Sequence, residues 1–178
     1  YDVGERRRRD TMERYVIERN MPGAGKMSSE DAHKGTARSL EVLKDLSADL
    51  YILAGYMRIV GPLIIQELRG KMINIHPALL PSFPGLHAQR QAIEYGVKIS
   101  GCTVHIVDEG MDTGPIILQA AVPVLEGDDE DRLAGRILQE EHRCLPLAAR
   151  LFCEGKLEIR GRRVVIHPEQ EKTPRNSG

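Results

Sequence analysis

The stretch that decides the fold class is DLYILAGYMRIVGPLIIQELRGKMINIH, which opens with DLYILAG (49–55) and closes with MINIH (72–76). Both end segments are short apolar runs, and such runs are typical of strands buried on both faces of a parallel sheet. Between them, residues 61–69 predict a short helix, because Pro62 is well suited to a first helical turn. A strand, a helix and a second strand in this order indicate one unit of an α/β sheet.

The rest of the chain continues the alternation of strands and helices. Further strands are expected at 15–18, 102–107 and 115–124, helices at 29–46, 88–95 and 128–153, and a terminal hairpin at 157–167. The predicted fold is therefore α/β, with an open, mostly parallel, Rossmann-like sheet flanked by helices. Such sheets bind ligands beyond the carboxyl ends of their strands. We expect residues 1–167 to form a single domain and 168–178 to be a disordered tail.

The composition favours a small-molecule enzyme over a nucleic-acid or membrane protein. The chain has 178 residues, 41% hydrophobic and 29% charged, which suits one domain with a substantial core. A net charge of −1 and an aromatic content of 4% without Trp disfavour binding to nucleic acid or anionic membrane. No apolar run approaches the roughly 20 residues of a membrane-spanning helix. The three cysteines include no CxxC pair, so we expect free thiols and a cytoplasmic location.

Polar residues at the end of the second apolar strand are the first candidates for chemistry. Asn74 and His76 alternate along the strand, so both side chains project to the same side. Taken alone, the pair is compatible with a buried structural network or with a site. Asp112, in the loop DEGMDTG (108–114), would favour the imidazolium form of a nearby histidine. Together the three residues would supply a carbonyl-polarising donor, a proton carrier and its orienting group, which suits acyl transfer without a covalent intermediate.

Other catalytic arrangements find no support in the sequence. There is no GxSxG elbow for a serine nucleophile and no HExxH spacing for zinc, so no metal is expected. Cys102 lies inside an apolar strand, which favours a structural thiol over a nucleophile. His87, His105 and His142 are likewise interpreted as structural.

Three segments resemble one enzyme family. INIHPALLPSFPGLHAQRQAIEYG (73–96) and GCTVHIVDEGMDTGPIILQAAVPV (101–124) resemble the core signature of phosphoribosylglycinamide formyltransferases. LAGYMRIV (53–60) resembles the folate-binding segment of the same family, and the three segments occur in the family's order and near its spacing. The resemblance implies formyl transfer from 10-formyltetrahydrofolate, as co-substrate and without a metal, to the amine of glycinamide ribonucleotide in de novo purine biosynthesis.

The resemblance also implies roles for particular residues. His76 would be the catalytic histidine, Asn74 the donor to the formyl oxygen and Asp112 the carboxylate that supports the histidine. Gly85 and Glu141 would contact glycinamide ribonucleotide, and a cis peptide would precede Pro81. The implied partners are the two small-molecule substrates and no nucleic acid or membrane, and a homodimer is compatible with the family. The implied folate-binding residues are Leu53, Met57, Arg58, Ile59, Val60, Asn74, Val107, Asp108, Glu109, Gly110, Met111 and Asp112.

The front of the chain departs from the family pattern. Family members open with a strand and a glycine-containing loop that binds the ribonucleotide phosphate, and nothing in this sequence matches that loop. Residues 15–18 resemble the family's third strand. The predicted domain therefore lacks an N-terminal strand–helix–strand unit, on the order of 30 residues or more. Glu30 also stands where the family often carries Arg.

Two alternative functions remain open at this point. A formyltetrahydrofolate deformylase would share the scaffold and deliver the formyl group to water, but we would expect a second histidine directly after the catalytic one, where this chain has Pro77. A non-catalytic folate-binding remnant would keep the pterin pocket after losing the phosphate loop. The presence of Asn74, His76 and Asp112 argues against it, because a binding module has no need of all three.

Overall fold

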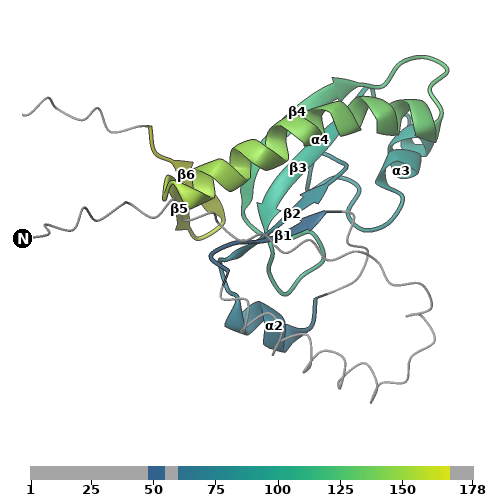
Figure 1. The fold of residues 1–178 in the computed structure, drawn as a ribbon. Helices are drawn as coiled ribbons and strands as arrows, with labels where there is room; N and C mark the ends of the chain where they lie inside the picture. The colour runs from purple at the N-terminus through teal and green to yellow at the C-terminus, as the bar shows by residue number, and fades with distance from the viewer. Residues whose placement is uncertain (1–47, 55–59, 169–178) are drawn as a thin grey trace, which may run out of the picture.

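The computed structural model describes residues 48–54 and 60–168 (Figure 1). The predicted elements at 15–18 and 29–46, the tail from 169 onward, and three folate-binding candidates (Met57, Arg58 and Ile59) lie outside the described residues. The described elements are β1 (Tyr51–Ala54), α2 (Pro62–Glu67), β2 (Met72–His76), α3 (Ala88–Tyr95), β3 (Ile99–Ile106), β4 (Ile116–Pro123), α4 (Glu130–Cys153), β5 (Leu157–Arg160) and β6 (Arg163–Ile166). Every strand and helix predicted within these ranges is confirmed, and so is the cis peptide between Leu80 and Pro81.

The described residues form a sheet of six strands in the order β1-β2-β3-β4-β6-β5. β1 pairs with β2, and β4 with β6, in parallel. The pairings of β2 with β3, β3 with β4 and β5 with β6 are antiparallel. For the described residues, the prediction of a mostly parallel sheet is therefore wrong, and the sheet is mixed. The reason is visible at residues 107–115, which connect β3 to β4, because a parallel pair needs a crossover of a dozen or more residues.

The sheet is covered by helices that bury its apolar side chains. α4 packs against β3 and β4, and Figure 1 shows it lying along the sheet, with α2 beneath β1 and β2. The main core joins strand residues such as Ile73 and Val104, each 0% exposed, to Leu133 and Ile137 of α4, at 0% and 1%. A second cluster packs α2 against Tyr51 and Leu53. Burying each large aliphatic side chain contributes about 1.5–3 kcal/mol, so these two clusters hold the layers together.

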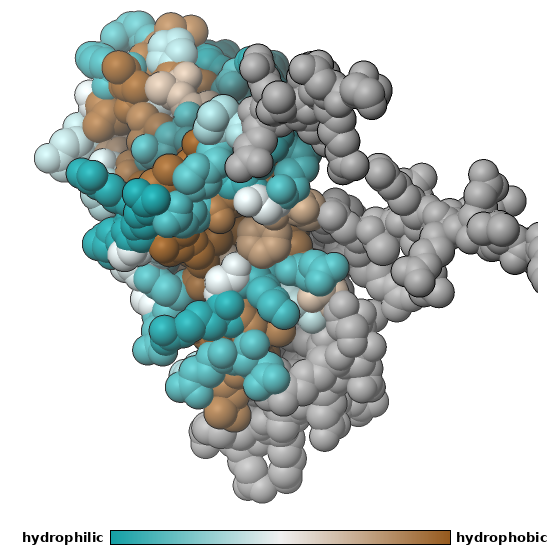
Figure 2. Space-filling view, turned by 90° about the vertical axis from the view of Figure 1, so that its left-hand side faces the viewer, coloured by the Kyte–Doolittle hydropathy of each residue, from teal (hydrophilic) through white to brown (hydrophobic). Residues whose placement is uncertain are grey.

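The surface left outside this core is mixed. On the face shown in Figure 2, apolar side chains form patches between hydrophilic ones. Within the described residues, no helix combines the length and apolar character needed to cross a bilayer.

Cys102 lies in the main core, where burial and the neighbouring Cys144 thiol raise its pKa to about 12. A thiol with so high a pKa is a poor nucleophile near neutral pH, which fits the structural interpretation.

The start of α4 is fixed by acidic residues. The Asp129 side chain accepts a hydrogen bond from the Arg132 N–H at 2.8 Å, and Glu130 and Asp131 complement the dipole in the first turn. Just before the helix, both carboxylate oxygens of Asp128 accept hydrogen bonds from Arg136, at 2.8 and 3.0 Å. The loop before α4 is thereby tied to the second turn of the helix.

This ion pair predicts an acid-sensitive contribution to stability. The Arg136 guanidinium and the Leu125 N–H lower the pKa of Asp128 to about 2. Because the pKa is lowered on folding, the stabilisation is present above the unfolded value of 3.8 and is lost as the pH falls toward 2. Asp128→Asn should therefore lower the midpoint of thermal unfolding at about pH 6. Between about pH 5 and pH 2, the midpoint of this variant should fall less than that of the wild-type protein. The matched change Glu126→Gln, in the same exposed loop, should leave the pH dependence as it is.

Candidate active site

The site lies where β2 ends and β3 runs beside it. In the antiparallel register, Asn74 stands opposite His105 and His76 opposite Thr103. Residues opposite each other in such a pair project to the same face, so four polar side chains share one face of two buried strands. His76, Thr103 and His105 are 4%, 0% and 3% exposed, which means that their polar atoms depend on protein partners.

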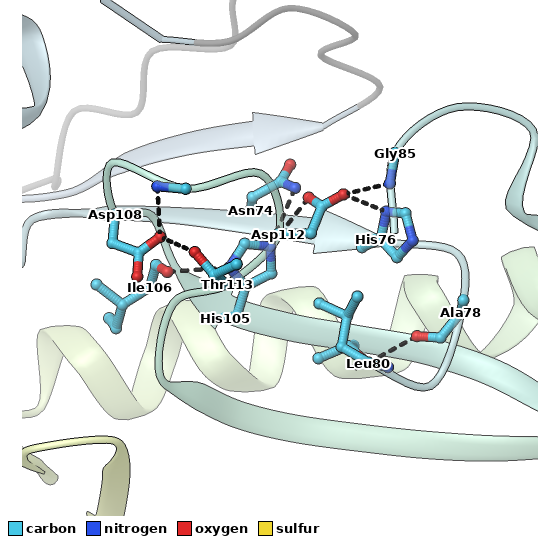
Figure 3. A network of polar contacts seen from close by, with 12 residues as sticks. Asn74, His76, Ala78, Leu80, Gly85, His105, Ile106, Asp108, Asp112 and Thr113 are labelled. Carbon is cyan, nitrogen blue, oxygen red and sulfur yellow. Dashed lines mark hydrogen bonds and ion pairs between the residues drawn. The ribbon is translucent and has the colours of Figure 1, made fainter. Parts of the chain in front are cut away.

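Asp112 links the two histidines. Its Oδ2 is 3.4 Å from Nδ1 of His76, and its Oδ1 is 3.6 Å from Nε2 of His105 (Figure 3). The Gly85 N–H donates to Oδ2 at 2.8 Å. Asp112 itself has φ of 54°, a left-handed conformation that Asp tolerates better than most residues. The loop between β3 and β4 therefore turns sharply enough to place one carboxylate between two imidazoles.

The electrostatics of the cluster keep Asp112 ionised. Burial acts to raise the pKa of its carboxyl, but the hydrogen bonds from His105 and the Gly85 N–H, with the charges of the two histidines, outweigh burial and lower the pKa. An ionised carboxylate at this position can accept from either imidazole and so helps to orient both rings.

His76 is engaged on both ring nitrogens. Its Nε2 donates to the carbonyl oxygen of Phe83 at 2.8 Å, while Nδ1 faces Asp112. Phe83, Gly85 and His87 all have positive φ, at 54°, 81° and 58°, so the segment that holds this carbonyl turns back over the end of β2. For His76 to exchange a proton with a substrate, one of the two protein contacts must give way to the substrate.

A hydrogen-bond clamp holds the segment that follows β2. The Thr103 hydroxyl donates to the Ala78 carbonyl at 2.7 Å and accepts from the Leu80 N–H at 3.0 Å. The side-chain amide of Gln119, on β4, donates to the Leu80 carbonyl at 2.9 Å and to the Thr103 hydroxyl at 3.0 Å. This Thr103–Gln119 clamp fixes residues 78–80, which directly follow the pocket-lining Pro77, against β3 and β4.

A pocket of about 580 Å³ opens beside the cluster. This volume lies within the range of small-molecule sites, which combine an apolar wall with a few converging polar groups. Its apolar lining residues include Leu53, Val60, Ile75, Val107 and Met111, and its polar lining residues include Asn74, His76, His105, Asp112 and Glu141. Burial raises the pKa of the Glu141 carboxyl, against a smaller opposing effect of His142, so this carboxyl is poorly solvated.

Most residues predicted for the site do meet at this pocket. Its lining includes Leu53, Val60, Asn74, His76, Gly85, Val107, Asp108, Gly110, Met111, Asp112 and Glu141. Glu109 does not line it, and its carboxylate lies 3.7 Å from Arg69 with 62% of the side chain exposed. Asp108 shapes the loop, since one of its oxygens accepts from the Gly110 N–H and the Thr113 hydroxyl. The residue that sequence reasoning set aside is His105, whose place in the cluster follows from the antiparallel pairing of β2 with β3.

These features define an α/β protein with an Asn–His–Asp cluster at the mouth of a pocket. The chain belongs to the formyl transferase family, whose family model, described as formyl transferase, matches residues 5–149. It is 43% identical over 133 residues to phosphoribosylglycinamide formyltransferase of Escherichia coli K12, covering 74% of this chain and 63% of the relative.

Solved structures show the same likeness. A glycinamide ribonucleotide transformylase from Symbiobacterium toebii has a TM-score of 0.76 at 54% identity, covering 83% of this chain and 68% of that one. A formyltetrahydrofolate deformylase from Pseudomonas syringae has a TM-score of 0.75 at 31% identity, covering 80% of this chain and 48% of that one. The chain spans less than two thirds of the length of the curated relatives that it first matches.

Proposed function

We propose that this protein transfers the formyl group of 10-formyltetrahydrofolate to the amino group of glycinamide ribonucleotide, the step of purine biosynthesis performed by the relatives to which it is similar. The observation that carries the proposal is the contact of His76 with Asp112, at 3.4 Å, beside Asn74 at the edge of a pocket of about 580 Å³. A folate-binding protein without catalysis has no need of this arrangement.

The chemistry assigns one task to each residue. The amine nitrogen forms a bond to the formyl carbon, and the bond from that carbon to N10 of the folate then breaks. The Asn74 amide would donate to the formyl oxygen as it gains negative charge, which is worth about 100- to 1,000-fold in rate for one such donor. His76 would carry the proton released by the amine toward N10, and Asp112 would hold the imidazolium while it exists.

The pocket divides between the two substrates in this proposal. The apolar wall of Leu53, Val60, Val107 and Met111 suits a flat pterin ring. Gly85 and Glu141, which also line the pocket, would contact the ribonucleotide. The poorly solvated Glu141 carboxylate is well placed to attract the amine as an ammonium ion before it loses its proton.

One set of measurements with the 178-residue chain tests the proposal. Calorimetry with a 10-formyl folate analogue and with glycinamide ribonucleotide should show binding of both, and an assay with 10-formyltetrahydrofolate should show transfer that depends on the ribonucleotide. Loss of the formyl group to water without the ribonucleotide would instead indicate a deformylase. Folate binding with neither reaction would indicate a non-catalytic remnant, and binding of neither compound would overturn the proposal.

Removing the charge of Asp112 should change both the rate and its pH dependence. Asp112→Asn is expected to lower the transfer rate by about 10- to 1,000-fold, because His76 loses its counterion and its orienting group. The pH–rate profile should also change, because the carboxylate that titrates beside His76, with its lowered pKa, is replaced by an amide that does not titrate. Glu94→Gln removes the same negative charge from an exposed position on α3, and it should change neither the transfer rate nor its pH dependence. An unchanged profile in Asp112→Asn would contradict the coupling of Asp112 to His76.

A further inference from the structure

The Asn74 amide has one end occupied and one end without a partner. Its Nδ2 lies 3.3 Å from Nε2 of His105, whereas its Oδ1 is buried and accepts no hydrogen bond from the described residues. Figure 3 shows the nitrogen end of the amide turned toward His105 and the oxygen end turned away. A buried amide oxygen without a donor is costly, so this orientation needs a cause.

The cause lies in the proton of His105. Nδ1 of this ring is 2.9 Å from the carbonyl oxygen of Ile106, an acceptor, so Nδ1 carries a proton. If the ring is neutral, Nε2 is then bare and can only accept, which draws the NH₂ group of Asn74 toward it. In this state the amide cannot offer its NH₂ group to a substrate.

A second proton on His105 reverses this preference. Protonated Nε2 becomes a donor, and its favoured partner is Oδ1 of Asn74. Half a turn of the amide places Oδ1 against His105 and leaves the NH₂ group where the unpaired oxygen now lies. Because Nδ1 is directed at Ile106, only the doubly protonated ring can donate from Nε2 toward Oδ1 of Asp112, 3.6 Å away, the contact that helps to lower the Asp112 pKa. The other titratable groups around the pocket are His76 on β2, Asp108 in the loop, and Glu130 and Glu141 on α4, with His87 before α3.

We propose that His105 is a positioning residue whose protonation decides which end of the Asn74 amide faces the reacting formyl group. The inference rests on the proposed function, because it is the formyl oxygen that would receive the NH₂ group. It assigns the two histidines of the cluster different tasks. His76 moves a proton during the reaction, and His105 sets the direction of the oxyanion donor before it.

A double-mutant cycle tests whether His105 acts through Asn74. At a pH where Nε2 of His105 is protonated in the wild-type protein, His105→Leu should lower kcat for formyl transfer by about 10- to 100-fold while KM for the folate stays within about threefold. In an Asn74→Ala background, where there is no amide to orient, the same change should cost less than about threefold. His105→Gln, whose amide can donate to Oδ1 without titrating, should recover kcat to within about tenfold of wild type. An equal loss in both backgrounds would show that His105 acts through Asp112 and overturn the proposal.

A measurement without catalysis separates this inference from the proposed function. In the wild-type chain labelled with ¹⁵N in histidine and asparagine, nitrogen shifts distinguish a bare from a protonated Nε2. Acid titration of the free protein should protonate Nε2 of His105 and shift the Asn74 amide signals with the same midpoint. Protonation of His105 with unchanged Asn74 signals would overturn the inference, whether or not the chain transfers a formyl group. Coupled signals in a chain that shows no transfer would support the inference and count against the proposed function.

Discussion

Replacing His76 by alanine is expected to lower the rate of formyl transfer by about 100- to 10,000-fold, the range found for the loss of a positioned acid–base group. The affinity for a 10-formyl folate analogue should stay within a few-fold, because His76 acts on the transition state rather than on the bound substrate. The two quantities are measured by single-turnover transfer and by calorimetry on the same protein preparation.

The control for this variant is a histidine outside the site. His167 follows β6 and pairs with Glu158 at 2.8 Å, far along the chain from the cluster. His167→Ala should leave the transfer rate within about twofold, since it removes no contact of the reacting groups. A large loss of folate affinity in His76→Ala would instead show that His76 holds the pocket together through its contact with Phe83.

Gly114→Ala should damage both the fold and the site. A Cβ atom at this position would collide with the backbone carbonyl of Ile106, at the end of β3. The carbonyl cannot move without breaking the turn into β4, so we expect the free energy of unfolding to fall by about 3 kcal/mol. For a chain of this size the corresponding fall in the midpoint of thermal unfolding is about 6–12 °C. The same shift would carry Asp112 away from the histidines and lower the transfer rate.

Gly135→Ala, in contrast to Gly114→Ala, should stabilise the protein. A Cβ atom at this position on α4 meets nothing within 4 Å, so the only effect is on the helix backbone. Alanine should stabilise the protein by up to about 1 kcal/mol, as in other helix interiors. If Gly114→Ala unfolds at the same temperature as wild type, the approach of residue 114 to β3 is not a fixed feature of the protein.

Local patterns in the sequence were enough to locate the elements but not to orient them. The apolar run before Asn74 predicted β2, and the acidic first turn predicted the start of α4. The direction of β3 was missed because alternation along a strand says nothing of its neighbour. β3 also begins at Ile99, before the predicted 102, since Gly101 is a poor strand residue in isolation. Its lack of a side chain is required by the adjacent Ala120 carbonyl, a tertiary contact that no local pattern reveals.

The candidate site was predictable in part for the same reason. Alternation placed Asn74 and His76 on one face, the loop at 108–114 suggested Asp112 as their partner, and the resemblance to formyltransferases supplied the pocket residues. His105 was interpreted as structural because its importance depends on which residue of β2 it faces. That partner is fixed by the antiparallel register, which the sequence did not predict.

The Thr103–Gln119 clamp has a consequence for how the protein is made. The segment that it holds, residues 78–80, leaves the ribosome before either of its anchors, since Thr103 comes 23 residues after Leu80 and Gln119 comes 39 residues after it. Translation proceeds at about 5–20 residues per second, so several seconds can separate the synthesis of Leu80 from the synthesis of Gln119. The segment directly after Pro77 therefore lacks part of its anchoring until β4 has been synthesised, and we expect nascent chains that stop before Gln119 to bind folate more weakly.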